Sequence, residues 1–314
     1  PTILINGSEG IGTGFCTKIP CYNPIDVVNN LLKVIDGEEQ TEMKPRYRGF
    51  KGQIQKDSDK FGKFNTYGKY EKLSETKIRI YELPVGVWTD KYKLILDKLE
   101  KSKVIKSYIS NSSDELVDFT LDFDEDTLDD LISKKKIWEK LKLVSHVQSG
   151  CMYAFGANNE LKHYHTPAEI ITDFYKERYA GYIARKKYLI EQLTLEKDIL
   201  LYKMKFIRAV INRKLIIEKK KKQQIISELE ELEYPKLEDG TYNYLMTMNL
   251  WHLTEEKVNE LNEKYKNKEE ELATVIDTSE TDMWKTDLQE FLEQYNIYAI
   301  EEPPKATNNK KKSK

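Results

Sequence analysis

The sequence predicts an α+β fold, in which a mixed α/β domain is followed by a long antiparallel coiled-coil arm with a helical knob. Up to residue 165, short stretches of alternating apolar side chains are interspersed with segments of helical periodicity. After Pro167, residues 168–208 contain no further proline and one glycine, which predicts a single long helix. From residue 258 onward, apolar side chains recur at steps of three and four, as in a heptad seam.

A glycine-rich loop is the first feature of the chain. Residues 3–5 form an apolar run that is typical of a strand. The loop that follows contains Gly7, Gly10, Gly12 and Gly14. Ile11 lies between two of these glycines, where it has little local core to join, so we expect an exposed apolar side chain suited to wedging between stacked bases. Because the spacing matches neither the dinucleotide fingerprint nor the phosphate loop, a purely structural turn stays open as an alternative.

Helical spacing and end signals predict a helix over residues 24–35. Asn23 and Pro24 are typical of a helix start, and Asp36 and Gly37 end it. Residues 76–82 alternate as a strand, with Ile78 and Ile80 on one face, and residues 115–123 alternate too, with Leu116 among the apolar side chains. Helices are expected at 90–101 and 125–135, and a pair of strands at 141–155.

The arm is predicted from two helical patterns. Thr166 is a plausible N-cap, with Pro167 at the first helical position. The second helix begins after Thr254, and its expected seam comprises Val258, Leu261, Tyr265, Lys268, Leu272 and Val275. A packed helical bundle is the alternative for the same pattern. Residues 209–253, between the two helices, include an apolar run that is unusual for a loop, so we expect a compact knob there.

The overall composition excludes little by itself. The net charge is only −2, so nucleic-acid binding has to be judged from local charge. No apolar run approaches the ~18 residues of a membrane span. Three cysteines, an odd and sparse set, argue for a reducing compartment. His163 and His165 have no supporting motif for a metal site, and we expect a polar turn there. Because the chain starts with Pro1, we expect a piece of a longer protein.

Basic residues cluster between positions 44 and 72, where nine of them stand against three acidic residues with aromatics between. They are Lys44, Arg46, Arg48, Lys51, Lys56, Lys60, Lys63, Lys69 and Lys72. Clustered cations of this kind neutralise phosphates and release counterions, so the region predicts nucleic-acid binding. A solvated surface over a small β unit is the equally weighted alternative.

Seven segments in the same order resemble one family. They are ILINGSEGIGTGFCTKIP (3–20), YNPIDVVNNLLKVIDGEE (22–39), YRGFKGQI (47–54), IYELPVGVWTDKYK (80–93), TPAEIITDFYKERYAGYIARKKYLI (166–190), YNYLMTMNLWHLTEEK (242–257) and MWKTDLQEFLEQ (283–294). Together they resemble eukaryotic-type DNA topoisomerase II, in the part that follows the catalytic winged-helix domain. Phe15 departs from the family's usual tryptophan. The resemblance covers about residues 1–298.

The resemblance implies a domain order. Residues 1–20 are expected to finish the winged-helix region, and residues 21–165 to form a tower-like α/β domain that supports DNA. Residues 166–300 are expected to form the coiled-coil arm, the dimerising knob (209–253) at the exit gate, and the return helix. Residues 301–314 form a basic low-complexity tail that we expect to be disordered.

The resemblance also implies site residues. Ile11, flanked by Gly10 and Gly12, matches the side chain that inserts between base pairs and bends the duplex. The residues expected to contact the DNA backbone are Lys18, Lys44, Arg46, Arg48 and Lys51. Those expected near the dimer contact are Leu245, Met248, Leu250 and Trp251.

The function implied is that of an ATP-dependent enzyme that passes one duplex through a transient break in another. Magnesium and ATP are expected in the full-length enzyme and neither in this fragment, which lacks the nucleophilic tyrosine and is expected to be inactive alone. The expected partners are double-stranded DNA and a second copy of the chain. We expect a nuclear location, or a cytoplasmic viral factory for a viral source. The rivals are a non-enzymatic, chromosome-organising DNA-bridging protein and a bacterial-type topoisomerase subunit.

Overall fold

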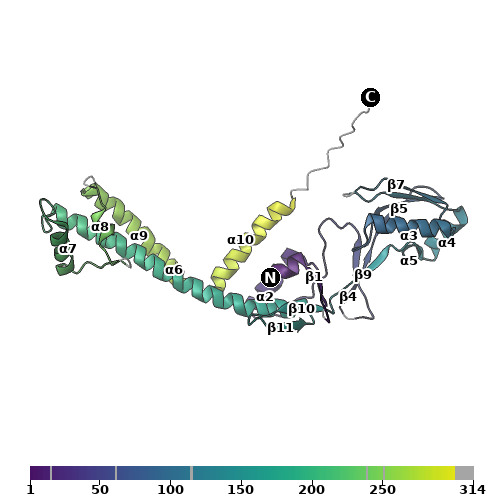
Figure 1. Cartoon of the computed structure of the whole chain (residues 1–314), viewed down its shortest axis with the longest axis horizontal. Coiled ribbons are helices and arrows are strands. Elements are labelled where there is room, and N and C mark those ends of the chain that lie inside the picture. Colours follow the sequence, from purple (N-terminus) through teal and green to yellow (C-terminus); the bar gives the residue numbers. More distant parts are fainter. Residues whose placement is uncertain (15, 61, 114–115, 238–239, 250–251, 301–314) are drawn as a thin grey trace, which may run out of the picture. The chain divides into compact units, whose positions relative to one another are not determined.

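The computed structural model describes residues 1–14, 16–60, 62–113, 116–237, 240–249 and 252–300 (Figure 1). The chain divides into two compact units. Unit 1 contains Pro1–Glu177 and the described residues from Phe291 onward, and unit 2 contains Arg178–Glu290. The predicted mixture of helices and strands is confirmed. Within the ranges given above, no helix is long and apolar enough to cross a membrane.

The chain begins with a short helix and a hairpin. They are α1 (Thr2–Asn6), β1 (Ser8–Ile11) and β2 (Cys16–Ile19), and β1 pairs antiparallel with β2. The strand expected at residues 3–5 was wrong, since these residues belong to α1. Three apolar residues fit one helical turn as well as a strand, and the helix fully buries Leu4, whose carbonyl accepts a hydrogen bond from the Tyr22 amide at 2.7 Å.

The helix predicted at 24–35 is confirmed as α2 (Pro24–Ile35). The Asn23 side chain accepts a hydrogen bond from the Ile25 amide at 3.3 Å, which caps the free end of the helix. At the other end Gly37 adopts a φ of 75°, a left-handed conformation that terminates helices. The apolar stripe of α2 buries Val27, Val28 and Leu31.

A three-stranded sheet and a second hairpin follow in unit 1. The strands are β3 (Gln53–Lys56), β4 (Lys63–Tyr67), β9 (Val144–Gln148), β10 (Met152–Phe155) and β11 (Leu161–Tyr164). The sheet has the order β3-β4-β9, and β10 pairs with β11. The two strands expected within 141–155 exist as β9 and β10, but they belong to different sheets. His163 lies in β11, so the turn expected there begins only after it.

A hydrophobic core of unit 1 lies under a four-stranded sheet of order β5-β6-β8-β7. Its strands are β5 (Lys69–Lys72), β6 (Lys77–Glu82), β7 (Ser107–Ser110) and β8 (Phe119–Asp122), and its helices are α3 (Thr89–Lys101), α4 (Glu125–Ser133) and α5 (Ile137–Lys140). Ile78 pairs with Leu121 and Ile80 with Phe119, and all four side chains are fully buried. They pack with residues of the three helices, including Tyr92, Leu128 and Ile137, so the helices cover one face of the sheet (Figure 1).

The strand expected over 115–123 is shorter than predicted. It begins at Phe119, and Leu116 is half exposed, its carbonyl accepting a hydrogen bond from the Ser113 amide at 2.8 Å. Alternation of apolar residues at 116, 119, 121 and 123 is not strictly periodic, and only the last three side chains join the core. The helices expected at 90–101 and 125–135 are confirmed as α3 and α4.

In unit 2 the predicted long helices pack antiparallel. The first is α6 (Pro167–Ile211), which begins in unit 1, and the second is α9 (Glu255–Asp277), capped by the Thr254 hydroxyl. Met204 and Ile207 of α6 bury against Val258 and Leu261 of α9. Farther along, Lys268 of α9 forms an ion pair at 3.1 Å with Glu196 of α6, so the polar member of the predicted seam also faces its partner helix.

The segment between α6 and α9 packs with the C-terminal end of α6 around a further core. It contains α7 (Lys222–Glu231) and α8 (Asn243–Met246). The buried side chains are Phe206, Leu215, Ile225, Leu229, Tyr234, Tyr242 and Leu245. The last helix, α10 (Glu280–Ile300), starts in unit 2, where Trp284 stacks on Tyr182 of α6 with ring centroids 5.2 Å apart.

Candidate nucleic-acid interface

The β1–β2 hairpin presents Ile11 to solvent. Ile11 ends β1, opposite Cys16 at the start of β2, and its side chain is 89% exposed. Gly10 lies within β1 and Gly12 directly follows it. An isoleucine this exposed gains nothing from the protein core, whereas burial of its side chain elsewhere is worth about 1.5–3 kcal/mol. The hairpin therefore carries at its tip an apolar side chain that would gain free energy from burial by a partner.

The base of the hairpin is held firmly. Gly7 adopts a φ of 69°, and a Cβ there would lie 2.9 Å from the Ile19 carbonyl oxygen, so only glycine fits between α1 and β1. The Thr17 hydroxyl donates to the Tyr153 carbonyl at 2.7 Å, and the Lys18 amide donates to the Cys151 carbonyl at 2.8 Å. These bonds fix β2 against β10, so the exposed end of the hairpin stands on a rigid support.

The basic segment 44–51 is anchored through its backbone. Pro45 pairs with Tyr22 in an isolated antiparallel bridge, and the Arg46 amide donates to the Cys21 carbonyl at 2.7 Å. The Lys51 amide donates to Glu82 Oε2 at 3.0 Å. Backbone hydrogen bonds thus hold the segment to the rest of unit 1. The cationic side chains of Lys44, Arg46, Arg48 and Lys51 are exposed.

The ion pairs divide the basic residues into two groups. Lys56 pairs with Glu42 at 2.6 Å, Lys63 with Asp57 at 3.1 Å, and Lys72 with Asp129 at 2.9 Å. In contrast, within the described part of the chain none of the side chains of Lys44, Arg46, Arg48 and Lys51 forms an ion pair with a carboxylate. Lys18, on the hairpin, pairs with Glu9 at 3.1 Å. Lys60 and Lys69 also form no ion pair among the described residues, so four of the six basic residues of the 44–72 cluster without a carboxylate partner lie at 44–51.

Two tyrosines of α10 bind the exposed arginines, an arrangement that the sequence did not reveal. Arg48 Nη1 donates to the Tyr298 hydroxyl at 2.5 Å, and its guanidinium carbon lies 4.8 Å from the Tyr298 ring centroid. Arg46 Nη1 donates to Asn23 Oδ1 at 2.6 Å and to the Tyr295 hydroxyl at 3.4 Å. Nothing in the sequence links positions about 250 residues apart; only the i, i+3 spacing of the tyrosines hinted at a shared helical face.

Tyr47 lies between Arg46 and Arg48 within the basic segment. Burial raises the pKa of Tyr47 to about 12, with smaller contributions from Cys21 and Glu9. A phenol that is harder to ionise than usual is a poor nucleophile at neutral pH. The structure therefore gives no support for covalent catalysis by Tyr47.

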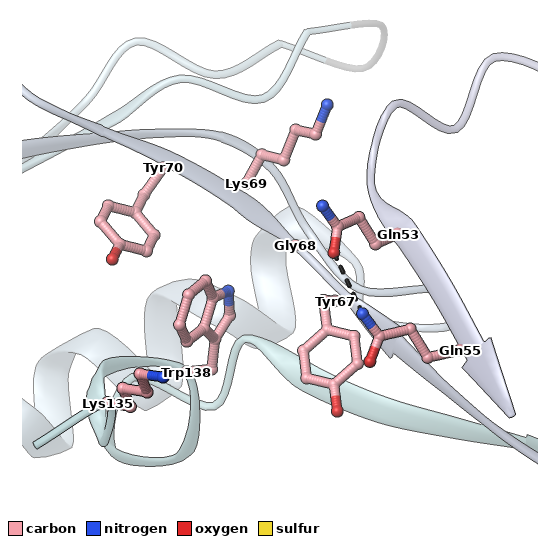
Figure 2. Close-up of a pocket in the computed structure, with 8 residues that line it drawn as sticks. All are labelled: Gln53, Gln55, Tyr67, Gly68, Lys69, Tyr70, Lys135 and Trp138. Atoms are coloured by element: carbon pink, nitrogen blue, oxygen red, sulfur yellow. Dashed lines mark hydrogen bonds between the residues drawn. The ribbon is translucent and has the colours of Figure 1, made fainter. Parts of the chain in front are cut away.

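A cleft of about 640 Å³ is lined by residues of β3, β4 and β5, which follow the basic segment in the chain. Figure 2 shows Trp138 between the rings of Tyr67 and Tyr70, with centroid distances of 6.4 and 5.5 Å. On the β3 side of the cleft, Gln55 Nε2 donates a hydrogen bond to Gln53 Oε1 at 3.3 Å (Figure 2). Lys69 and Lys135 also line the cleft. The lining contains cations, amides and aromatic rings but no nucleophile beside a base, so the cleft suits binding rather than chemistry.

The described residues do not fit a magnesium site. Among them, no group of three or more histidine, cysteine, aspartate or glutamate side chains is placed to hold a metal ion. Asp124 directly precedes α4 and forms an ion pair with Lys106 at 2.8 Å. His163 stacks on Tyr153 with ring centroids 4.4 Å apart, which gives it a packing role in the β10–β11 hairpin.

The residues expected at the dimer contact fall into three situations. Leu245 is buried in the core of unit 2, and Met248 is half-buried beside it. Leu250 and Trp251 lie outside the described residues. The sequence did not draw attention to Ile216 and Leu232, which flank α7 and are 53% and 50% exposed. Ile216 lies between Leu215 and Ile217, and the sequence does not show which of the three side chains faces solvent, so only the structure identifies it as exposed.

Comparison with known proteins identifies the family of the chain. A family model that describes the A subunit of DNA gyrase/topoisomerase IV matches residues 1–289. The chain belongs to this family. The rest of the comparison refines the position within it: the chain is 33% identical to DNA topoisomerase 2 of Acanthamoeba polyphaga mimivirus and 33% identical to DNA topoisomerase 2-alpha of Mus musculus, over 94% and 96% of its length. The resemblance stated from the seven sequence segments is confirmed.

A solved structure gives the same relationship. The crystal structure of the Plasmodium falciparum topoisomerase II DNA-binding, cleavage and re-ligation domain superimposes with a TM-score of 0.83 at 34% identity. The match covers 96% of this chain and 45% of that one. The chain spans 29% of the mimivirus relative and 22% of the mouse relative. This topoisomerase chain therefore corresponds to a limited part of its relatives.

Proposed function

We propose that this chain is the DNA-supporting and dimer-forming part of a type II DNA topoisomerase, an ATP-dependent isomerase that passes one duplex through a transient double-strand break in another. The observation that carries the DNA role is Ile11, 89% exposed at the end of a braced hairpin. Insertion of an apolar side chain unstacks a base step and kinks the duplex, at an expense of a few kcal/mol that additional wrapping contacts offset.

The cations at 44–51 supply those contacts in this proposal. Lys44, Arg46, Arg48 and Lys51 have no carboxylate partner among the described residues, so they can replace counterions on phosphates without breaking an ion pair. Lys18 also contacts DNA, but it first has to leave Glu9. The domain assignment follows: residues 1–20 finish the winged-helix region and residues 21–165 form the tower-like support.

Residues 166–300 form a coiled-coil arm, a dimerising knob at 209–253 and a return helix in the same proposal. Support comes from the antiparallel packing of α6 on α9 and from the core that the connecting segment forms with the end of α6. We assign the contact with a second copy to the exposed Ile216 and Leu232 together with Trp251, while Leu245 supports the surface from within. A symmetric contact places the same patch on both copies.

Magnesium, ATP and the nucleophilic tyrosine belong to other parts of the full-length enzyme in this proposal, and a nuclear location, or a viral factory for a viral source, stays a prediction. A non-enzymatic, DNA-bridging coiled-coil protein is not favoured, because the family match extends through residues 1–289 rather than only through the helical part.

The DNA role is tested by bending. We expect binding of the 314-residue chain to bring the two ends of a duplex of about 30 base pairs closer together. Energy transfer between fluorescent labels at the two ends measures this bending. Ile11→Ala should reduce this bending and leave the chain's mass in solution unchanged. Bending that is unaffected by the substitution would remove Ile11 from the mechanism.

The dimer role is tested by light scattering. Leu232→Asp and Trp251→Asp should each shift the chain from dimer to monomer, because a buried, unpaired carboxylate is strongly unfavourable at an interface. Ile276→Asp is the matched control, since Ile276 is also 50% exposed but lies on α9 outside the knob. A chain that is monomeric without any substitution would overturn the assignment of residues 209–253 as sufficient for dimerisation.

A further inference from the structure

The arginines of the basic segment have only neutral partners among the described residues. Arg46 is held by Asn23 and Tyr295, and Arg48 by Tyr298, through the hydrogen bonds described above. A tyrosine hydroxyl or an amide oxygen accepts a hydrogen bond without cancelling the cationic charge, whereas a carboxylate cancels it. Each guanidinium carries five donors, so most of them stay available for another acceptor.

The tyrosines belong to an aromatic row on one face of α10. Phe291 stacks on Tyr295 with centroids 5.8 Å apart and planes 17° apart, and Tyr295 lies 6.4 Å from Tyr298. The spacings of four and three residues align these side chains along a helix. Each ring is thus restrained by its neighbour, and the hydroxyls meet the arginines at fixed positions.

We infer that Tyr295 and Tyr298 are positioning residues for DNA binding, which hold the guanidinium groups of Arg46 and Arg48 in place for phosphate oxygens. The inference rests on the proposed DNA role of segment 44–51. An arginine that is ordered before binding loses less rotamer freedom when it meets a phosphate. Removal of the hydroxyls should therefore weaken binding although the tyrosines themselves do not touch DNA.

This assignment gives α10 a function beyond that of a return helix. The C-terminal part of α10, from Phe291 onward, belongs to unit 1 together with the segment that carries the arginines. The tyrosines and the arginines therefore belong to one compact unit, and the contact between them lies within the surface of that unit. Tyr298 could instead contact DNA directly. A double-mutant cycle with Arg48 distinguishes this direct contact from a positioning role.

The test uses the 314-residue chain and a fluorescent duplex of about 30 base pairs. Tyr298→Phe keeps the ring and removes the hydroxyl, and we expect binding to weaken two- to tenfold. In the Arg48→Ala background, Tyr298→Phe should have no further effect. Tyr188→Phe is the control, since Tyr188 is 59% exposed on α6 and should leave the affinity unchanged. Equal thermal melting of all variants excludes a loss of fold.

The outcomes separate the inference from the proposal beneath it. If Arg48→Ala and Arg46→Ala bind DNA as well as the unaltered chain, both the DNA role of this segment and the inference are overturned. If the arginine variants bind more weakly but Tyr298→Phe does not, only the positioning role is overturned. An effect of Tyr298→Phe that persists in the Arg48→Ala background identifies a direct contact and also overturns it, as does tighter binding on loss of the hydroxyl.

Discussion

The Tyr182 hydroxyl of α6 donates a hydrogen bond to Asp287 Oδ2 of α10 at 2.6 Å, joining two helices of unit 2 whose residues are 105 positions apart. Arg185, one turn along α6, donates to the same oxygen at 2.6 Å. The Tyr182 ring is buried against Trp284, so the hydroxyl is held in place by packing. One carboxylate thus receives two donors from a single face of α6.

Asp287→Asn should destabilise unit 2. The substitution keeps the shape but weakens two hydrogen bonds to a charged acceptor, each worth about 1.5–3 kcal/mol when fully formed and less where solvent reaches them. We expect a loss of about 1–2 kcal/mol in the free energy of unfolding, measured by urea denaturation. Asp277→Asn, an exposed residue at the end of α9, should change it by less than about 0.5 kcal/mol. Equal effects of the two variants would contradict the assignment.

The same residue predicts a pH dependence. Burial pushes the pKa of Asp287 upward, but the hydrogen bonds from Tyr182 and Arg185 and the charge of Arg185 outweigh it, so the pKa lies below its ordinary 3.8. A lowered folded-state pKa stabilises the fold above the unfolded value, and the contribution disappears as the pH falls through the folded value. The stability difference between the unaltered chain and Asp287→Asn should therefore be constant from neutral pH to about 5 and shrink below about 4. A difference that grows on acidification would show the opposite sign.

Two glycines should respond to alanine in opposite directions. A Cβ on Gly68 would lie 2.5 Å from the Glu82 carbonyl oxygen, where β4 passes into β5, so Gly68→Ala should destabilise by about 1–3 kcal/mol. Gly181 lies within α6 with open space around it, and Gly181→Ala should stabilise by about 0.5–1 kcal/mol because alanine restricts the unfolded chain. Thermal melting of both variants checks the pair, and the same sign for both would refute it.

The unpaired and paired lysines predict different salt dependences. Lys51→Gln should reduce the slope of log affinity against log salt by about 0.9 for each phosphate that the chain no longer neutralises. Lys72→Gln removes a lysine already paired with Asp129 at 2.9 Å, and it should leave the slope unchanged. Fluorescence anisotropy between about 50 and 200 mM salt measures both. A reduced slope for Lys72→Gln alone would move the DNA surface away from segment 44–51.

Segments with a clear period could be predicted from the sequence, including the six-residue strand β6, whereas segments too short to express a period could not. The repeated apolar stripe and both end signals of residues 24–35 define α2 within a residue, as Thr166 and Thr254 do for the starts of α6 and α9. Residues 3–5 fill only one helical turn, too short for either period to be expressed, and α1 was predicted as a strand. Local sequence patterns do not show which strands pair, so only the structure shows that β9 and β10 belong to different sheets.

The site divides along the same lines. Exposure of Ile11 follows from its glycine neighbours, and the basic residues at 44–51 are visible in the composition. Which lysines are neutralised depends on carboxylates as distant in sequence as Asp129 is from Lys72, and the tyrosines that hold Arg46 and Arg48 come from the far end of the chain. Such pairings are set by tertiary folding, which no local periodicity records.

The chain leaves unit 1 within α6 and returns to it within α10, so both crossings occur inside continuous helices rather than in loops. Helical phase then limits how unit 2 can change in length. One inserted residue turns everything beyond it by about 100°, whereas seven residues make close to two full turns and nearly restore the direction. Insertions and deletions along these helices should therefore be tolerated in steps of about seven residues, so the long helices of unit 2 can change in length only in discrete increments.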